Sequence, residues 1–261
     1  KKQNKFELII INDNSKDNSL KKVYKYKEKY SNIKIINNDK NIGPGSSRNK
    51  GIQIAKGKYI LFVDSDDCLV KNSLDILINK IENKNFDLLA FNFNLFSRNK
   101  KLFKKRKDLL LLKLKKSNIL SLFLAGEIDG SVIFTLFNKK LIIKNMITFP
   151  KFLHEDIPFI FKSYLYAKNI LILNKVIYLK RNHNKSIVNN INEKRIIGIL
   201  RAWRSLPKIL NKEKNSLVIL DNYYRGLRGI IGSLVKLSSS SLKKNNRILP
   251  YNFLYDYLSV L

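Results

Sequence analysis

Short apolar runs that end at polar loops dominate the first hundred residues of the chain. Such runs are typical of strands buried in a parallel sheet, and four of them occur, at residues 6–11, 33–36, 59–63 and 86–93. Apolar side chains at helical spacing follow residue 20 and recur over residues 46–55 and 70–81. This alternation predicts an α/β fold with a mainly parallel sheet flanked by helices, in which ligands bind at the carboxyl ends of the strands.

The pattern changes after residue 96. Residues 98–116 are dense in Lys and Arg with Leu interleaved, residues 119–125 predict a helix, and residues 132–137 fit either a strand or a short helix. The remaining predictions are a helix over residues 157–165, a strand–turn–strand over residues 170–179, and helices from residue 193 onward.

The charge of the chain is strongly unbalanced. Lys and Arg number 51 against 20 Asp and Glu, which gives a formal net charge of +31. Such an excess fits a polyanionic partner such as nucleic acid or an anionic membrane. It also fits compositional drift, because the excess is mostly Lys and accompanies abundant Asn and Ile, as AT-rich codons produce. The sequence has neither Arg-rich helices nor an aromatic RNA-binding signature, so no nucleic-acid partner is expected.

The composition excludes several other classes of protein. The single cysteine, Cys68, rules out an internal disulfide framework and a Cys-rich zinc module. No apolar run of the sequence approaches the ~18 residues typical of a membrane-spanning helix. Hydrophobic residues make up 44% of the chain, which is enough to bury a core.

The sharpest candidate site is the acidic loop, residues 64–67, which directly follows the strand predicted over residues 59–63. Its carboxylates, on Asp64, Asp66 and Asp67, repel one another, so the loop favours a bound cation. Mg²⁺ and Mn²⁺ are typically held by one or two carboxylates together with phosphate oxygens. The alternative is a solvated turn in which Asp67 caps a helix that begins near Leu69.

Two further polar positions belong to the same half of the chain. Asp13 follows the first strand, where its carboxylate is placed to accept hydrogen bonds from a nucleobase or a ribose; a local Asx turn is the alternative. Arg48 lies at a helix start, after a tight turn at residues 41–45. It faces either a phosphate or base, or an acid of the acidic loop. The segment is no Walker-type phosphate loop, because it lacks Gly-Lys-Ser/Thr.

Acids also open a predicted helix in the second half of the chain. His154, Glu155 and Asp156 precede Pro158, an order that suits a first helical turn. Adjacent side chains diverge, so one of the two acids is a candidate general base. Helix capping and compensation of the helix dipole, worth ~1 kcal/mol, are the alternative. Residues 178–186, which include His183, are either a loop that contacts diphosphate or metal, or a solvated basic turn.

These motifs occur in a fixed order along the chain. A strand precedes Asp13, a glycine-rich turn precedes Arg48, a strand precedes the acidic loop, and the pair Glu155-Asp156 is followed by Arg181. In this order and spacing they resemble the family-2 glycosyltransferases of GT-A fold, over about residues 6–188. The bacterial enzymes that build surface polysaccharides such as capsule or lipooligosaccharide are the most similar in kind.

The resemblance implies an inverting transfer of a hexose or N-acetylhexosamine from a nucleotide sugar, with UDP as the expected nucleotide. The implied acceptor is a hydroxyl of a growing surface glycan or of a lipid-linked molecule. Asp156 is implied as the general base, and Asp66 as the ligand of a Mn²⁺ or Mg²⁺ cofactor, with His183 as a further metal or phosphate contact. The implied nucleotide-sugar contacts are Asp13 at the uracil or ribose, Arg48 beside the nucleotide, Asp64 at the ribose, Asp67 at the border of the sugar pocket, and Glu155.

The same resemblance divides the chain into three parts. They are the nucleotide-sugar-binding half at residues 1–96, the acceptor-side half at residues 97–192, and a C-terminal helical region at residues 193–261. The family usually has Gly where Asn14 stands, and it begins with a strand and a helix ahead of the strand at residues 6–11. We therefore expect a fragment of a longer protein, or a catalytically impaired product. A basic, non-enzymatic binder of nucleic acid or anionic surfaces is the remaining alternative.

The basic stretch at residues 98–116 adds an expectation about location. Juxtamembrane Lys and Arg contribute ~1 kcal/mol each near anionic lipid. We therefore expect a cytoplasmic protein with peripheral contact at the inner face of the cell membrane, through Lys104, Lys105, Arg106 and Lys107. A solvated helix face is the alternative.

Overall fold

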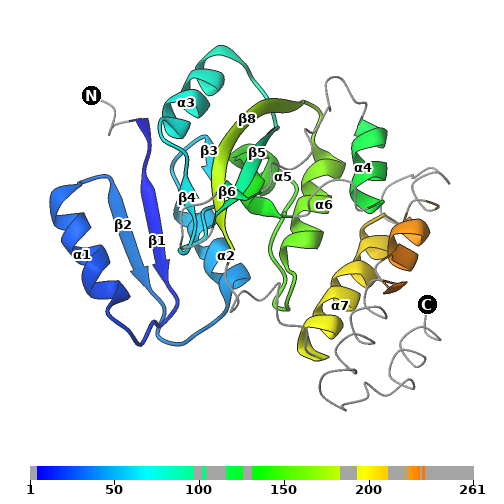
Figure 1. The fold of residues 1–261 in the computed structure, drawn as a ribbon, viewed down its shortest axis with the longest axis horizontal. Coiled ribbons are helices and arrows are strands. Elements are labelled where there is room, and N and C mark those ends of the chain that lie inside the picture. Colours follow the sequence, from blue (N-terminus) through cyan, green and yellow to red (C-terminus); the bar gives the residue numbers. More distant parts are fainter. Residues whose placement is uncertain are drawn as a thin grey trace.

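The computed structural model describes residues 5–96, 102–103, 116–125, 131–182, 193–210, 221, 223–229 and 231–232. Strands and helices alternate along the chain (Figure 1). The strands are β1 (Leu8–Asn12), β2 (Ile33–Asn37), β3 (Tyr59–Leu61), β4 (Cys68–Leu69), β5 (Leu88–Phe96), β6 (Leu102–Phe103), β7 (Thr135–Asn138) and β8 (Ile170–Arg181). The helices are α1 (Ser19–Lys29), α2 (Pro44–Ile54), α3 (Ser73–Asn83), α4 (Lys116–Leu124), the 3-10 helix η2 (Val132–Phe134), α5 (Lys139–Lys144), α6 (Asp156–Tyr166) and α7 (Glu193–Leu210).

The described strands form two sheets, one of two strands and one of six. β1 and β2 pair in parallel, with Leu8 opposite Ile33. The other strands run in the order β3-β7-β5-β8-β4, with β6 added to β5; of these pairs β5/β8 is parallel and the others are antiparallel. The predicted α/β fold is confirmed, but the sheet is less parallel than the sequence suggested. The difference arises because the short strands β4, β6 and β7 each return antiparallel to a longer strand.

Strand β8 replaces the expected strand–turn–strand at residues 170–179. It is one strand of 12 residues, and its register against β5 shifts between Phe91 and Asn92 and again between Asn92 and Phe93. The side chain of Asn92 donates a hydrogen bond to the Asn174 side chain at 2.9 Å. The polar pair Asn174-Lys175 therefore lies in a bulge, which the sequence pattern made look like a turn. Residues 132–137 form both predicted alternatives, since η2 leads directly into β7.

A cluster of phenylalanines lies beneath the candidate site. The rings of Phe149 and Phe159 stack at 3.9 Å between centroids. Phe62 meets both edge-on, at 5.4 and 5.8 Å, and Phe137 packs on Phe62 and Phe159. Phe62 comes two residues before the acidic loop, and Phe149 precedes α6. One core cluster thus supports two chain segments that are far apart in the sequence.

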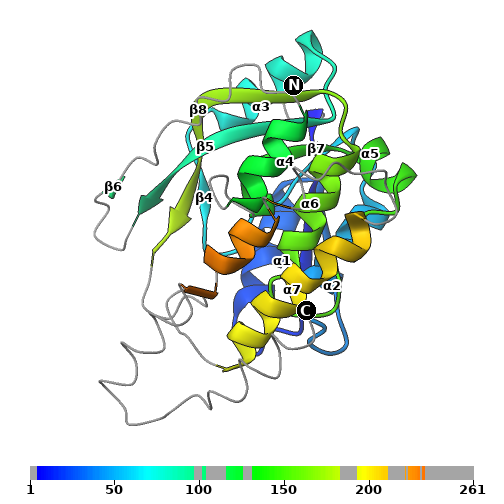
Figure 2. The same cartoon turned by 90° about the vertical axis from the view of Figure 1, so that its right-hand side faces the viewer.

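Helices α4 and α7 pack against α6, and the three lie side by side (Figure 2). Trp203 of α7 and Leu120 of α4 are both buried there. Within the described residues, no helix combines the length and apolar character needed to cross a bilayer.

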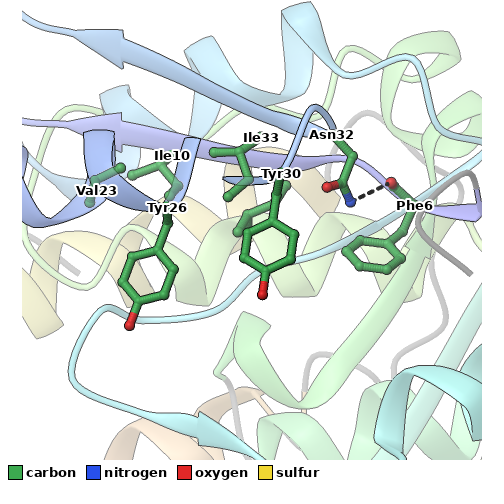
Figure 3. Close-up of a pocket in the computed structure, with 8 residues that line it drawn as sticks. Phe6, Ile10, Val23, Tyr26, Tyr30, Asn32 and Ile33 are labelled. Atoms are coloured by element: carbon green, nitrogen blue, oxygen red, sulfur yellow. Dashed lines mark hydrogen bonds between the residues drawn. The ribbon is translucent and has the colours of Figure 1, made fainter. Parts of the chain in front are cut away.

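The N-terminal unit, formed by β1, α1 and β2, lies to one side of the larger sheet (Figure 1). Among the described strands, β1 pairs with β2 alone, and α1 contains no buried residue. An apolar groove of about 350 Å³ runs between β1 and α1, with the rings of Tyr26 and Tyr30 along it (Figure 3). The residues that line it are Phe6, Leu8, Ile10, Val23, Tyr26, Tyr30, Asn32 and Ile33.

Candidate active site

The acidic loop connects β3 to β4, and hydrogen bonds fix its shape. The backbone N–H of Asp67 donates to the carbonyl of Asp64 at 3.1 Å, which closes the turn. Both carboxylate oxygens of Asp67 are bonded to β8: one accepts from the Tyr178 hydroxyl at 2.8 Å, and the other from the backbone N–H of Arg181 at 2.7 Å. The loop is therefore anchored to β8 through Asp67, while Ser65 and Asp66 remain exposed. Asp67 caps no helix, because Leu69 belongs to β4 and α3 begins only at Ser73.

The charges of the acidic loop act on one another. Burial raises the pKa of Asp67 above its ordinary value, and the neighbouring carboxylates of Asp66 and Asp64 raise it further. The hydrogen bonds from Arg181 and Tyr178 lower this pKa and only partly offset the rise. The ionised form of Asp67 is therefore disfavoured in this position, and a cation nearby would stabilise it.

Arg48 of α2 joins the acidic loop to the segment before α6. Its guanidinium donates to Asp64 at 2.8 Å and to Glu155 at 2.9 Å, and it lies over the Phe149 ring at 5.5 Å. The side chain of Arg48 is 19% exposed, that of Glu155 10% and that of Asp64 37%. Of the two interpretations of Arg48, the structure shows the ion pair with an acid of the loop. Its expected contact with the nucleotide stays a prediction.

The start of α2 is shaped to receive the segment before α6. A Cβ atom on Gly45 would lie 2.6 Å from the Cγ of Glu155 and 3.1 Å from the Cβ of Phe149, so a side chain there would displace that segment. The Asn49 side chain donates to the Phe149 carbonyl at 2.8 Å and accepts from its N–H at 2.9 Å. Gly45, Arg48 and Asn49 of one motif therefore position residues 149–155.

Glu155 and Asp156 have different surroundings. Glu155 is 8% exposed and is committed to Arg48. It occupies the N-cap position of α6 without a side-chain capping bond, so the capping alternative does not apply to it. Asp156 is the first residue of α6 and is only partly buried. Of the two acids, Asp156 is therefore the better candidate for a general base.

Asp13 holds the turn that precedes α2. Its carboxylate accepts from the backbone N–H groups of Ile42 and Gly43, both at 2.8 Å, and from the Asn38 side chain at 2.9 Å. Burial acts to raise the pKa of Asp13, but these hydrogen bonds, together with one from Ser47, hold it below its usual value. The bonds span about 25 to 30 positions, so they are not a local Asx turn. Contact with a nucleobase or ribose stays a prediction.

Two of the expected site features lie outside the described residues. They are His183 and the basic cluster of Lys104, Lys105, Arg106 and Lys107. In the parts of the chain that the structure describes, no group of three or more His, Cys, Asp or Glu side chains is arranged to hold a metal ion.

The sequence analysis missed Asn38 as part of the site, and it placed Tyr178 in a loop or turn over residues 178–186, whereas residues 178–181 belong to β8. Tyr178 stands inside an apolar strand, where an aromatic ring is ordinary, so no sequence signal marks its hydroxyl. Asn38 follows the second strand, in the same position as Asp13 after the first. That parallel was a usable signal, because both residues lie at the same edge of the β1/β2 pair.

Comparisons with known proteins identify the family of the chain. The family model described as Glycosyl transferase family 2 matches residues 1–145. The cholesterol galactosyltransferase of Borreliella burgdorferi is 32% identical over 184 residues, which cover 66% of this chain and 51% of that protein. The poly(ribitol-phosphate) beta-N-acetylglucosaminyltransferase TarP of Staphylococcus aureus is 30% identical over 271 residues, covering 95% of this chain and 77% of TarP.

The same fold occurs in a solved structure. The crystal structure of S. aureus TarS has a TM-score of 0.68 and 24% identity, and the match covers 86% of this chain and 63% of that one. TarS has also been crystallised in complex with UDP-GlcNAc, and that structure matches with a TM-score of 0.62. The chain spans about half the length of the Borreliella protein.

Proposed function

Because the chain belongs to glycosyl transferase family 2, we propose that it moves a hexose or N-acetylhexosamine from a UDP-sugar to a hydroxyl. The acceptor is a growing surface glycan or a lipid-linked molecule. The names of two relatives support both sugar classes, since one is a galactosyltransferase and the other an N-acetylglucosaminyltransferase. TarS, which shares the fold, binds UDP-GlcNAc. The family does not favour the alternative of a basic, non-enzymatic binder.

The observation that carries the proposal is the bridge made by Arg48. It brings the acidic loop, at residues 64–67, to the segment that ends in Asp156, although some 90 residues separate them. A transferase needs acids in both places, one set beside the departing diphosphate and one beside the attacking hydroxyl.

The acidic loop fits a divalent cation by its chemistry. Asp66 is exposed on the loop, and its charge helps to raise the pKa of buried Asp67, so positive charge there relieves repulsion. We assign Asp66 as the protein ligand of Mn²⁺ or Mg²⁺, with oxygens of the donor diphosphate completing the shell. When bound, the cation supplies positive charge for the departing diphosphate. The contact of His183 with the metal or a phosphate stays a prediction.

The proposed reaction is a single displacement. Asp156 accepts the proton of the acceptor hydroxyl while that oxygen forms a bond to the anomeric carbon. The bond from this carbon to the diphosphate oxygen breaks at the same time, and the nucleoside diphosphate leaves with the bonding electrons. Because the attack comes from the opposite face, the anomeric configuration inverts. Asp13, Asp64 and Asp67 are proposed to border the nucleotide and sugar, and Arg48 and Glu155 to hold the two acidic segments together.

The excess of positive charge supports a location at a membrane surface. With 51 Lys and Arg against 20 Asp and Glu, the chain is attracted to anionic lipid headgroups. We propose a cytoplasmic enzyme with peripheral contact at the inner face of the membrane, where a lipid-linked acceptor is reached.

Substitution of Asp156 by Asn tests the base assignment. Release of UDP from UDP-sugars in the presence of Mn²⁺ should fall by about 10²–10⁴-fold, the usual contribution of a general base. Donor affinity, measured by calorimetric titration with and without Mn²⁺, should stay unchanged. Asp75→Asn is the matched control, because Asp75 lies in the first turn of α3, a helix as long as α6. Transfer that survives Asp156→Asn at the rate of the control rejects the assignment, and a chain that binds no nucleotide sugar rejects the proposed function.

A further inference from the structure

Tyr178 is a buried residue whose hydroxyl faces the acidic loop. It lies on β8 and is 0% exposed, and its ring meets Phe134 edge-on at 5.6 Å. The hydroxyl accepts a hydrogen bond from the backbone N–H of Asp64 at 3.0 Å and donates one to the Asp67 carboxylate at 2.8 Å. One oxygen atom therefore contacts both ends of the turn that presents Asp66.

Other contacts along β8 attach the same loop. The N–H of Arg181 donates to Asp67, and its Nε donates to the carbonyl of Asp66 at 2.6 Å. Strand β4 follows the loop and pairs with β8, with Leu69 opposite Tyr178. The loop is thus held through its backbone and through the carboxylate of Asp67.

The protonation of Tyr178 suits this arrangement. Burial raises the pKa of its hydroxyl far above the ordinary value, and the carboxylate of Asp67 raises it further. The hydroxyl therefore keeps its proton at neutral pH and remains the donor to Asp67. A neutral donor fixes the loop without neutralising its charge, so the loop keeps its affinity for a cation.

We propose that Tyr178 is a positioning residue of the transferase: its hydroxyl sets the conformation in which the acidic loop presents Asp66 to the cation and the donor diphosphate. The inference rests on the proposed function. The rival explanation is that the hydroxyl only satisfies buried polar groups, in which case its loss would lower stability and leave the cation requirement unchanged.

The test is Tyr178→Phe, which keeps the ring and removes the oxygen. Residues that orient metal ligands typically affect metal affinity by about 10–100-fold, so the Mn²⁺ concentration for half-maximal UDP release should rise by that factor. Amide hydrogen exchange at Asp64 should accelerate in the metal-free protein, because its acceptor is gone. Tyr223→Phe is the matched control, since Tyr223 is also buried and its hydroxyl donates to the Trp203 carbonyl, at 3.4 Å, away from the acidic loop.

A second variant distinguishes an effect on the acidic loop from a general loss of folding. Asp67→Ala removes the carboxylate that Tyr178 holds, so it should raise the Mn²⁺ requirement in the same way. The double variant should add little to either change, because contacting residues are not additive. If Tyr178→Phe leaves both the Mn²⁺ requirement and the Asp64 exchange rate at the level of the Tyr223→Phe control, the inference is overturned while the proposed function stands. A wild-type chain that neither binds nor cleaves a UDP-sugar overturns the function instead.

Discussion

The N-terminal unit and the sheet that carries the acidic loop cover their apolar side chains very differently. Leu88, Leu89 and Phe91 of β5 are at most 1% exposed, whereas Leu8 of β1 is 43% exposed and Tyr26 of α1 is 60% exposed. Both regions are built from apolar strands, so composition does not explain the contrast. The contrast shows that a well-buried sheet supports the acidic loop, whereas the N-terminal unit has fewer buried apolar contacts.

The polar contacts of the two regions differ in the same direction. Glu7 joins the N-terminal unit to the loop after α2, because its carboxylate accepts from the backbone N–H groups of Lys56 and Gly57. It also pairs with Lys34 of β2 at 2.6 Å, and the side chains of Glu7 and Lys34 are 20% and 40% exposed. The acidic loop joins α6 through Arg48 and Glu155, which are 19% and 10% exposed. The expectation that the chain is a fragment of a longer protein, or a catalytically impaired product, stays a prediction.

The largest expected effect is a difference in the free energy of unfolding when an aromatic ring is removed from each region. Phe159→Ala removes a ring that stacks on Phe149 under the site, and a buried Phe truncated to Ala typically costs about 3–5 kcal/mol. Tyr26→Ala, in the groove of the N-terminal unit, should change the free energy of unfolding by about 0.5 kcal/mol or less, because its side chain is exposed. Urea denaturation measures both. Equal losses would show that the N-terminal unit is as well packed as the sheet.

Much of the fold of both regions could be predicted from the sequence pattern. The strands at residues 6–11, 33–36, 59–63 and 86–93 correspond to β1, β2, β3 and β5, because a short apolar run stopped by polar residues has few other ways to bury itself. Asp64 and Asp156 were placed at a strand end and in a first helical turn for equally local reasons. The exposed groove of the N-terminal unit, by contrast, depends on what packs on β1, and local pattern carries no information on that.

The hydrogen-bond partners of Arg48 and Tyr178 could not be predicted from the sequence, because they too depend on how distant elements pack. Arg48 had two plausible partners, and only the packing of α2 against Phe149 selects Asp64 and Glu155. Tyr178 and Asp64 are 114 positions apart, and the bulge in β8 lies between its start and Tyr178. A bulge changes which face of the sheet a side chain occupies, so simple alternation along β8 would not locate this hydroxyl.

The next effect compares the two ion pairs. Arg48→Met leaves the carboxylate of Glu155 buried without its partner, and such a loss typically costs about 3–5 kcal/mol. We expect a value near the low end, about 3 kcal/mol, because the second partner, Asp64, is 37% exposed. Lys34→Met should cost about 1 kcal/mol or less, because Lys34 is 40% exposed and Glu7 keeps its bonds from the backbone N–H groups of Lys56 and Gly57. Thermal and urea denaturation measure the loss in free energy of unfolding of each variant. An equal loss for Lys34→Met and Arg48→Met would contradict the proposed difference between the two ion pairs.

The smallest expected effect is a difference in how the stability of the two regions changes in acid. It follows from pKa shifts of opposite sign at Glu7 and Asp67. Burial acts to raise the pKa of Glu7, but the bonds from Lys34, Lys56 and Gly57 outweigh it and lower that pKa below 4.5. The stabilisation from Glu7 is therefore present above about pH 4.5 and is lost as the pH falls through its folded pKa. The pKa of Asp67 is instead raised above 3.8, mainly by burial. Its folded form takes up a proton first, so the loop gains stability as the pH falls toward 3.8.

Hydrogen exchange can resolve these opposite trends within one molecule. After correction for the intrinsic exchange rate, protection of the β1 and β2 amides should weaken below about pH 4.5, while protection of residues 64–67 should hold or increase between pH 6 and pH 4. Glu7→Gln should flatten the first trend and leave the second untouched, because Glu7 contacts the N-terminal unit and the loop after α2 rather than the acidic loop. Parallel loss of protection in both regions would mean that one cooperative unit opens in acid, and that the contrast in packing does not extend to their stability.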